Sequence, residues 1–230
     1  MVTQELRAIA SIRSDFHEKF GIPRQSGLIH QMISTVVFEP EYRNPDAFRE
    51  IEGFSHLWLI WQFSKALRED WSPTVRPPRL GGNTRIGVFA SRSPFRPNRL
   101  GLSSVKIERI DTGRGVISVL GADLADGTPI YDIKPYVPYA DSHPDARGGF
   151  TDTSAWKPLK VVFAEEVSGS LLAQAELDAL CEILSQDPRP QYQDDPQREY
   201  GLLFAGHNVR FKVAEGVLTV ISIDPSNQCK

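Results

Sequence analysis

The sequence predicts a mainly β fold, in which an N-terminal β-barrel precedes a small C-terminal α+β domain. Up to residue 135, short β-branched and aromatic runs alternate with Gly- and Pro-containing turns, a pattern typical of barrels and sandwiches. Near Tyr136 the composition shifts to a polar stretch rich in Gly, Asp and Ser. We therefore expect a barrel over residues 1–137, a linker over 138–157 and an α+β domain over 158–230.

Six segments of the N-terminal part carry strand signals: residues 6–12, 28–38, 54–63, 84–90, 101–110 and 115–120. The turn at 111–115 joins the last two as a hairpin. The aromatic run FSHLWLIWQF at 54–63 is consistent with a strand buried on both faces, and a buried helix fits it as well. The loop at 72–83 holds several Pro and Gly residues, and a loop of this length in a compact domain is usually functional or disordered.

The C-terminal part shows a β-α-β-β order. A strand is expected at 159–167 and a helix at 170–186, whose apolar residues repeat on one face. The helix ends at Asp187, because a proline follows and disfavours the α conformation in the residue before it. Two further strands, at 208–213 and 217–223, pair as a hairpin.

The composition is that of an ordinary globular protein, with 40% hydrophobic and 24% charged residues. No apolar run approaches the roughly 18 residues of a membrane helix. The N-terminus lacks the basic and apolar regions of a signal peptide. Cys181 and Cys229 do not make a disulfide framework, and the His and Cys residues lack metal-ligand spacing. We expect a cytoplasmic protein with no membrane association and no metal.

Positive charge is concentrated in one segment of an acidic chain. The net charge is −3, yet residues 71–107 contain seven basic residues and no Asp or Glu. One interpretation is that these arginines pair with acids elsewhere in the fold. The other is a site for anionic groups, because the guanidinium presents a planar fork that matches carboxylate and phosphate.

Four short segments combine a stiff backbone with polar side chains: Pro23–Gln25, Phe54–Leu57, Ala90–Asn98 and Asp123–Tyr136. Proline beside arginine limits the entropy that is lost on binding. Asp126–Gly127 is a turn that can present backbone N–H groups or simply close a hairpin. His56 lies in an apolar run and suits the core as well as a site. Dinucleotide, P-loop and Gly-x-Ser-x-Gly motifs are absent.

Together these motifs resemble the TrmO (TsaA-like) family of tRNA adenine-N6 methyltransferases. The matching segments are PRQ at 23–25, SHLW at 55–58, RPPR at 76–79, GVFA at 87–90, RS at 92–93, FRPN at 95–98, DGTP at 126–129 and DIKPY at 132–136. The C-terminal segments DPRPxY at 187–192 and HNVR at 207–210 match the longer bacterial form. Arg99 stands where some relatives carry proline.

The resemblance implies a barrel that binds S-adenosylmethionine near a homodimer interface, with tRNA as partner. The substrate it implies is N6-threonylcarbamoyladenosine beside the anticodon, methylated on N6. The implied cofactor contacts are Pro23, Arg24, Gln25, His56, Leu57, Arg92, Leu102, Asp123, Leu124, Ala125, Asp126, Gly127 and Thr128. The expected RNA contacts are Arg76, Arg79 and Arg96 from the arginine-rich segment, with Asp187, Arg189, Pro190 and Tyr192 from the C-terminal part.

The chemistry of methyl transfer suits such a site. The exocyclic N6 is a weak nucleophile because its lone pair is delocalised, so an acceptor for its proton would help. Asp126 and Asn98 are the candidate acceptors. Two alternatives remain open: a non-catalytic RNA-binding barrel, and a sensor of a small carboxylate metabolite. Binding of radiolabelled S-adenosylmethionine tests the first alternative, and mass spectrometry of tRNA nucleosides tests the second.

Overall fold

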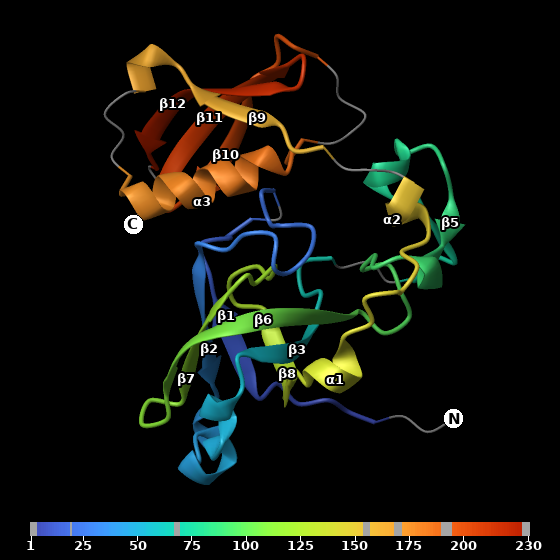
Figure 1. Cartoon of the computed structure of the whole chain (residues 1–230), viewed down its shortest axis with the longest axis vertical. Coiled ribbons are helices and arrows are strands. Elements are labelled where there is room, and N and C mark those ends of the chain that lie inside the picture. The colour runs from blue at the N-terminus through green and yellow to red at the C-terminus, as the bar shows by residue number, and fades with distance from the viewer. Residues whose placement is uncertain are drawn as a thin grey trace.

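Six antiparallel strands close into a barrel in the N-terminal half of the computed structural model (Figure 1). The structure describes residues 4–18, 20–66, 70–153, 157–167, 172–189 and 195–226. The strands are ordered β1-β2-β7-β6-β3-β8 around the barrel. Their bounds are β1 (Ala10–Arg13), β2 (Ile33–Phe38), β3 (His56–Gln62), β6 (Leu100–Asp111), β7 (Val116–Leu120) and β8 (Pro129–Pro135). The predicted fold class is confirmed.

Strand β3 shows how the sequence fills the barrel. Leu57, Leu59 and Trp61 are buried, and the residues between them are only half-buried, so side chains alternate between the two faces. The run is therefore a strand with one face in the core, rather than a strand buried on both faces. Its inward residues pack with Ile12, Val36 and other apolar side chains of the neighbouring strands.

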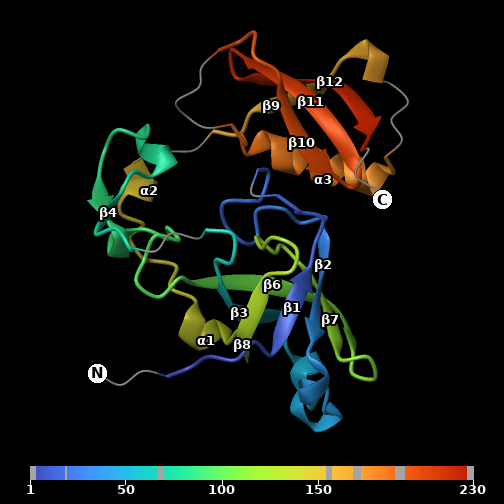
Figure 2. The same ribbon diagram turned by 180° about the vertical axis from the view of Figure 1, so that it is seen from behind.

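A two-stranded arm extends from the barrel between β3 and β6. It consists of β4 (Thr74–Val75) and β5 (Ile86–Gly87), with the 3₁₀ turns η4 (Pro78–Leu80) and η5 (Val88–Ala90). The predicted strand at 84–90 is thus shorter than expected, because its second half folds into η5. In both views of the molecule the arm lies beside helix α2 (Phe150–Thr153), which belongs to the predicted linker (Figures 1 and 2).

Short helical turns fill the remaining connections. The turns η1 (Pro40–Tyr42), η2 (Pro45–Phe48) and η3 (Ile51–Gly53) link β2 to β3, where one helical turn was expected. Helix α1 (Pro138–Asp141) follows β8, and the Asp141 carboxylate accepts a hydrogen bond from Trp58 Nε1 at 2.9 Å. The start of the linker is therefore fastened to the outside of the barrel.

The C-terminal unit is a four-stranded sheet with one helix against it. The elements are β9 (Lys160–Phe163), η6 (Glu165–Val167), α3 (Gln174–Ser185), β10 (Tyr200–Phe204), β11 (His207–Ala214) and β12 (Val217–Pro225). The sheet order is β10-β11-β12-β9, and β9 runs parallel to β12. Leu180, Ile183 and Leu184 of α3 are buried in one core with Leu218 and Phe211 of the sheet. Strand β10 was not predicted.

The connection between β1 and β2 joins the two units. Phe16, Ile29 and Met32 come from this connection, yet they are buried in the core of the C-terminal unit. The backbone N–H of His30 also donates to Glu182 Oε2 of α3 at 2.7 Å. Helix α3 accordingly lies between the C-terminal sheet and the barrel in both views (Figures 1 and 2).

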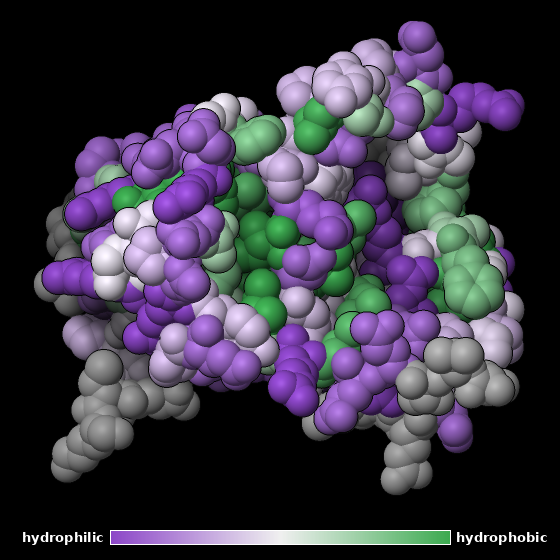
Figure 3. Space-filling model, turned by 90° about the horizontal axis from the view of Figure 1, so that it is seen from below, coloured by the Kyte–Doolittle hydropathy of each residue, from purple (hydrophilic) through white to green (hydrophobic). Residues whose placement is uncertain are grey.

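Several large apolar side chains stay at the surface, among them Leu102, which is 56% exposed. Seen from below, the molecule is hollowed near its centre, and hydrophobic residues gather in the hollow between hydrophilic rims (Figure 3). Within the described ranges, no helix has both the length and the apolar character that a bilayer crossing requires.

Candidate functional site

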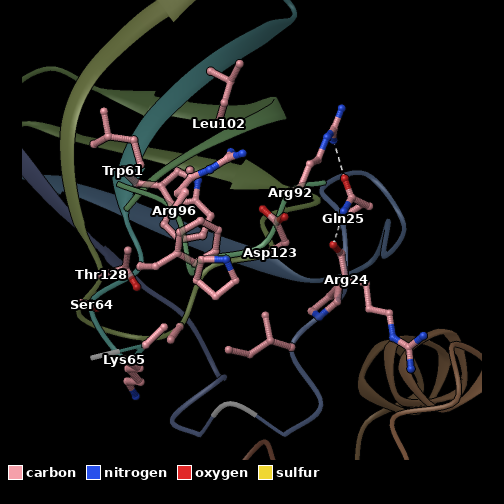
Figure 4. A pocket seen from close by; sticks show the side chains of 18 of the residues that line it. Arg24, Gln25, Trp61, Ser64, Lys65, Arg92, Arg96, Leu102, Asp123 and Thr128 are labelled. Carbon is pink, nitrogen blue, oxygen red and sulfur yellow. Dashed lines mark hydrogen bonds between the residues drawn. The ribbon is translucent and has the colours of Figure 1, made fainter. Parts of the chain in front are cut away.

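A cavity of about 550 Å³ opens where loops and strand ends meet on one side of the barrel (Figure 4). It is lined by Ile22–Gln25, Trp58, Trp61, Phe63–Ala66, Arg92, Pro94–Arg96, Leu100–Leu102, Asp123, Ala125 and Thr128. These residues come from four separate parts of the N-terminal half. The closed barrel helps to bring them together, because β3 and β6 pair directly, and β3 ends and β6 begins at the cavity.

Trp61 forms one wall because its neighbour across the ladder has no side chain. Trp61 pairs with Gly101, and a Cβ on Gly101 would lie 2.3 Å from Trp61 Cε2. The Trp61 ring also meets Phe63 edge-on, with 4.4 Å between ring centroids. The glycine therefore allows a large apolar side chain to lie across the strand at the cavity.

Asp123 is the carboxylate among the described residues that line this cavity. Its Oδ1 accepts a hydrogen bond from Ser103 Oγ at 2.5 Å, and Ser103 Oγ in turn accepts one from Trp61 Nε1 at 2.9 Å. Burial raises the pKa of Asp123 to about 6, although the Ser103 hydrogen bond and the nearby charge of Arg92 lower it. A carboxyl group that titrates close to neutral pH is suited to exchange a proton.

Arginines surround the mouth of the cavity. Arg92 donates a hydrogen bond to Gln25 Oε1, and Gln25 Nε2 donates to the Arg24 carbonyl at 2.5 Å (Figure 4). The Arg24 guanidinium turns toward the C-terminal unit, where its Nη2 donates to the Asp187 carbonyl at 3.0 Å. The pKa of Arg24 is lowered overall, because burial lowers it by more than the nearby charge of Asp187 raises it. Its buried Nη1 has no hydrogen-bond partner among the described residues, so it can serve an anionic ligand.

A larger groove of about 1270 Å³ adjoins the cavity, between the arm and the short helix α2. Six residues line both spaces: Arg24, Gln25, Phe63, Arg92, Pro94 and Phe95. Five arginines line the groove, at positions 24, 76, 79, 85 and 92, and its described lining contains no Asp or Glu. The described lining offers these arginines no carboxylate partner, which favours a site for anionic groups over pairing with acids of the fold. The groove favours a polyanion.

The structure brings most of the expected cofactor contacts to the cavity but not all. Pro23, Arg24, Gln25, Arg92, Leu102, Asp123, Ala125 and Thr128 line it. Leu57 and Leu124 are instead buried in the barrel core. The His56 ring bonds to Ser55 Oγ at 2.8 Å and lies against Tyr136, away from the cavity lining.

The two candidate proton acceptors also lie away from the cavity lining. Asp126 Oδ1 accepts from the Ser14 N–H at 3.1 Å, and its Oδ2 is 3.8 Å from Arg13 Nη1. Asn98 is exposed and lines neither the cavity nor the groove. Neither residue lines the cavity in this structure, and the contacts with Arg13 and Ser14 turn the Asp126 carboxylate toward the β1–β2 connection.

The turn at Asp126–Gly127 joins loops instead of presenting free donors to the cavity. Its two backbone N–H groups donate to the carbonyls of Phe16 and Ile12, at 2.8 and 2.9 Å. Gly127 is absent from the described lining of the cavity for the same reason. The turn therefore holds the neighbouring cavity residue Thr128 in place.

The expected RNA contacts are divided in the same way. Arg76 and Arg79 line the groove. Arg96 lines the cavity instead, and its Nη2 donates to the carbonyls of Val88 and Ser91 at 3.3 and 3.0 Å, which makes it a brace for η5. Arg189, 12% exposed, forms a two-pronged pair with Asp187 at 2.8 and 3.0 Å. Pro190 and Tyr192 lie outside the described residues.

Some lining residues were not among the expected contacts. Trp61, Phe63, Ser64 and Lys65 continue the aromatic run into the cavity, and Arg85 and Phe89 line the groove. Lys65 Nζ donates to the His17 carbonyl, which ties the end of β3 to the β1–β2 connection. The aromatic density of FSHLWLIWQF was the signal for Trp61 and Phe63, whereas Ser64 and Lys65 follow that run and belong to no motif.

The fold and the site define a barrel protein with a ligand-sized cavity beside a cationic groove. Comparison with known proteins places it more narrowly: the chain belongs to the tRNA-methyltransferase O family. The profile of the tRNA-methyltransferase O N-terminal domain matches residues 11–142, and that of the TrmO C-terminal domain matches residues 156–226.

Similar proteins cover nearly the whole chain. A tRNA (adenine(37)-N6)-methyltransferase of Escherichia coli K12 is 39% identical over 98% of this chain and 100% of its own length. One of Eikenella corrodens is 46% identical over 74% of this chain and 97% of its own. A crystal structure of TrmO from Pseudomonas aeruginosa superposes with a TM-score of 0.79 at 33% identity, covering 96% of this chain and 98% of that one.

Proposed function

We propose that this protein is an S-adenosylmethionine-dependent methyltransferase that methylates N6 of adenine 37 in tRNA. Its relatives carry this activity in their names. The observation on the molecule that carries the proposal is the junction of the two spaces, in which six residues line both the cavity and the arginine groove. A small cofactor in the cavity and a polyanionic substrate in the groove would meet at those residues.

The cavity residues fit S-adenosylmethionine. A space of about 550 Å³ lies within the roughly 300–1,000 Å³ of small-molecule sites. Trp61, Phe63 and Leu102 offer apolar surface for a nucleoside ring, and Arg92 offers a donor fork for a carboxylate. When bound, the cofactor supplies a methyl group on a positively charged sulfonium. The buried carboxylate of Asp123 places negative charge in the same space.

The finer substrate that we propose is adenine 37 carrying an N6-threonylcarbamoyl group. That group ends in a carboxylate, and so does the methionine part of the cofactor. Arg24 and Arg92 line both spaces, and Arg24 keeps a buried Nη1 without a partner among the described residues. These two guanidiniums provide charge-assisted donors for the two carboxylates.

Asp123 takes the role that the sequence left to Asp126 and Asn98. The attacking N6 must lose its proton as it bonds to the methyl carbon. Asp123 is the carboxylate of the described lining, and a pKa of about 6 leaves it mostly ionised at neutral pH. Ser103 and Trp61 fix its orientation through their hydrogen bonds. We assign it as the proton acceptor.

We propose that the protein forms a symmetric homodimer. We also propose that the C-terminal unit forms the second part of the tRNA site. Exposed apolar side chains outside the cavity, such as Ile33, which is 55% exposed, would be covered by a second copy. Light scattering at micromolar concentration tests the dimer, and a clean monomer would contradict it.

The activity is tested with undermodified tRNA from a strain that lacks its own methyltransferase. Methyl-labelled S-adenosylmethionine and this protein should label one adenine beside the anticodon. The comparison is tRNA with and without the threonylcarbamoyl group. Equal labelling of both tRNAs would show that the threonylcarbamoyl group is not required, while still supporting the methyltransferase activity.

A further inference from the structure

Two aromatic rings stack on each other at the surface of the arm. Phe89 is 77% exposed and Trp71 is 48% exposed. Their ring centroids are 6.3 Å apart, with 23° between the planes. Rings of this size leave a large apolar face in water unless something covers them. The proposed cofactor site uses neither residue.

The exposure of Phe89 is built into the turn that carries it. Its neighbour Val88 is buried, and the Val88 N–H donates to the Pro73 carbonyl at 3.0 Å. The Val88 carbonyl accepts from Ser91 Oγ at 2.8 Å and from Arg96 Nη2 at 3.3 Å. The backbone beside Phe89 is thus fixed with the ring at the surface.

Trp71 is held from the other side of the arm. The next residue, Ser72, donates its N–H to the Phe95 carbonyl at 3.0 Å, and its hydroxyl donates to the Thr74 carbonyl at 2.6 Å. Phe95 lines both the cavity and the groove. The stacked pair is therefore connected to the junction of the two spaces by short, hydrogen-bonded segments.

The surroundings of the pair are positively charged. Phe89 lines the groove together with Arg76, Arg79 and Arg85, and the described lining holds no carboxylate. Aromatic faces combined with guanidiniums that have no carboxylate beside them in the described lining suit single-stranded nucleic acid, whose bases stack on rings while its phosphates meet cations.

We propose that the Trp71–Phe89 stack is a platform for a nucleobase next to the target adenine in the anticodon loop, with the groove arginines on the flanking phosphates. This rests on the proposed function. An adenine that enters the cavity must leave the base stack of its loop, so its neighbour loses a stacking partner. Phe89 offers a replacement face in the groove that adjoins the cavity.

A second copy of this chain fits the groove less well. A two-fold contact through the groove would set the same surface against itself, and five arginines would face five arginines. An RNA strand supplies the negative charge that the described groove residues lack.

The test substitutes Phe89 and measures each ligand separately. Phe89→Ala should raise the KM for tRNA about tenfold or more, which is the scale of one lost base stack, and leave the Kd for S-adenosylmethionine unchanged. Phe89→Tyr keeps a stacking face and should restore most of the loss. Tyr139 is 92% exposed and lies outside the groove lining, so Tyr139→Ala is the matched control and should change neither value.

Two results would overturn the proposal. One is a tRNA KM for Phe89→Ala within twofold of the unsubstituted protein. The other is a loss that follows dissociation of a dimer in sedimentation runs, which would make the stack a contact between copies. Failure of the proposed function gives a separate result, because the unsubstituted protein would then transfer no methyl group to tRNA.

Discussion

Replacing Asp123 by Asn should separate stability from activity. The carboxyl group lies at the cavity, and burial raises its pKa from 3.8 to about 6. A group whose pKa is raised on folding favours the folded state below its unfolded pKa, and this contribution is lost as the pH rises through the folded pKa. Asn keeps an oxygen for the Ser103 hydroxyl and does not ionise.

The shift sets the size of the effect. A change from 3.8 to about 6 is close to two pKa units, and each unit corresponds to about 1.4 kcal/mol, so ionised Asp123 costs about 3 kcal/mol of unfolding free energy. At about pH 8 the unfolding free energy of the Asn variant should exceed that of the unsubstituted protein by up to about 3 kcal/mol, and at about pH 5 by roughly half as much.

Urea unfolding at the two pH values measures the stability, and single-turnover methylation measures the activity. We expect Asp123→Asn to be more stable at high pH and to lose about 100-fold or more in rate, the scale of general base catalysis. The rate of the unsubstituted protein should rise with pH through about 6. A variant that is less stable at both pH values would show that Arg92 stabilises the ionised form of Asp123 and that burial does not destabilise it.

Three further substitutions test Arg92, the Trp61 wall of the cavity and the Arg189–Asp187 pair. Arg92→Ala should weaken cofactor binding by about 1.5–3 kcal/mol in calorimetry, and Arg92→Lys should recover only part of it; unchanged affinity would assign this arginine to RNA or to the fold. Gly101→Ala would place a Cβ 2.3 Å from Trp61 Cε2, so it should lower the unfolding free energy by about 1–3 kcal/mol and weaken cofactor binding. An unchanged melting temperature would show that the Trp61 ring can move aside. Arg189→Ala should weaken the binding of cofactor and of tRNA by similar factors, because Arg189 holds Asp187, whose carbonyl accepts a hydrogen bond from Arg24. Weaker binding of tRNA alone would instead indicate that Arg189 contacts the RNA directly.

Strand periodicity is the part of the fold that the sequence predicts well. The β6–β7 hairpin and β3 follow from β-branched and aromatic residues flanking turn residues. Strand β8 was missed because Asp132 and Lys134 interrupt its apolar pattern. Strand β10 was missed because Gly201 weakens the signal and its pairing with β11 supplies what the local sequence lacks.

The site shows where single-sequence reasoning fails. Ser14 and Asp126 are 112 residues apart, and their hydrogen bond decides that Asp126 faces away from the cavity. Asp123 gains its environment from Ser103, 20 residues earlier, and Trp61 lies 42 residues before Ser103. No short motif contains these relations. The arginine-rich segment could be recognised from the sequence, because its charged residues are close together along the chain. The bracing role of Arg96 could not, because it depends on the carbonyls of Val88 and Ser91 in a turn.

Mass spectrometry of nucleosides from tRNA incubated with this protein and methyl-deuterated S-adenosylmethionine tests directly whether the protein methylates N6 of adenine 37. We predict a deuterated methyl group on N6 of the adenine beside the anticodon, and its loss in Asp123→Asn even at saturating cofactor. Bound cofactor and bound tRNA without any deuterium in the nucleosides would contradict it.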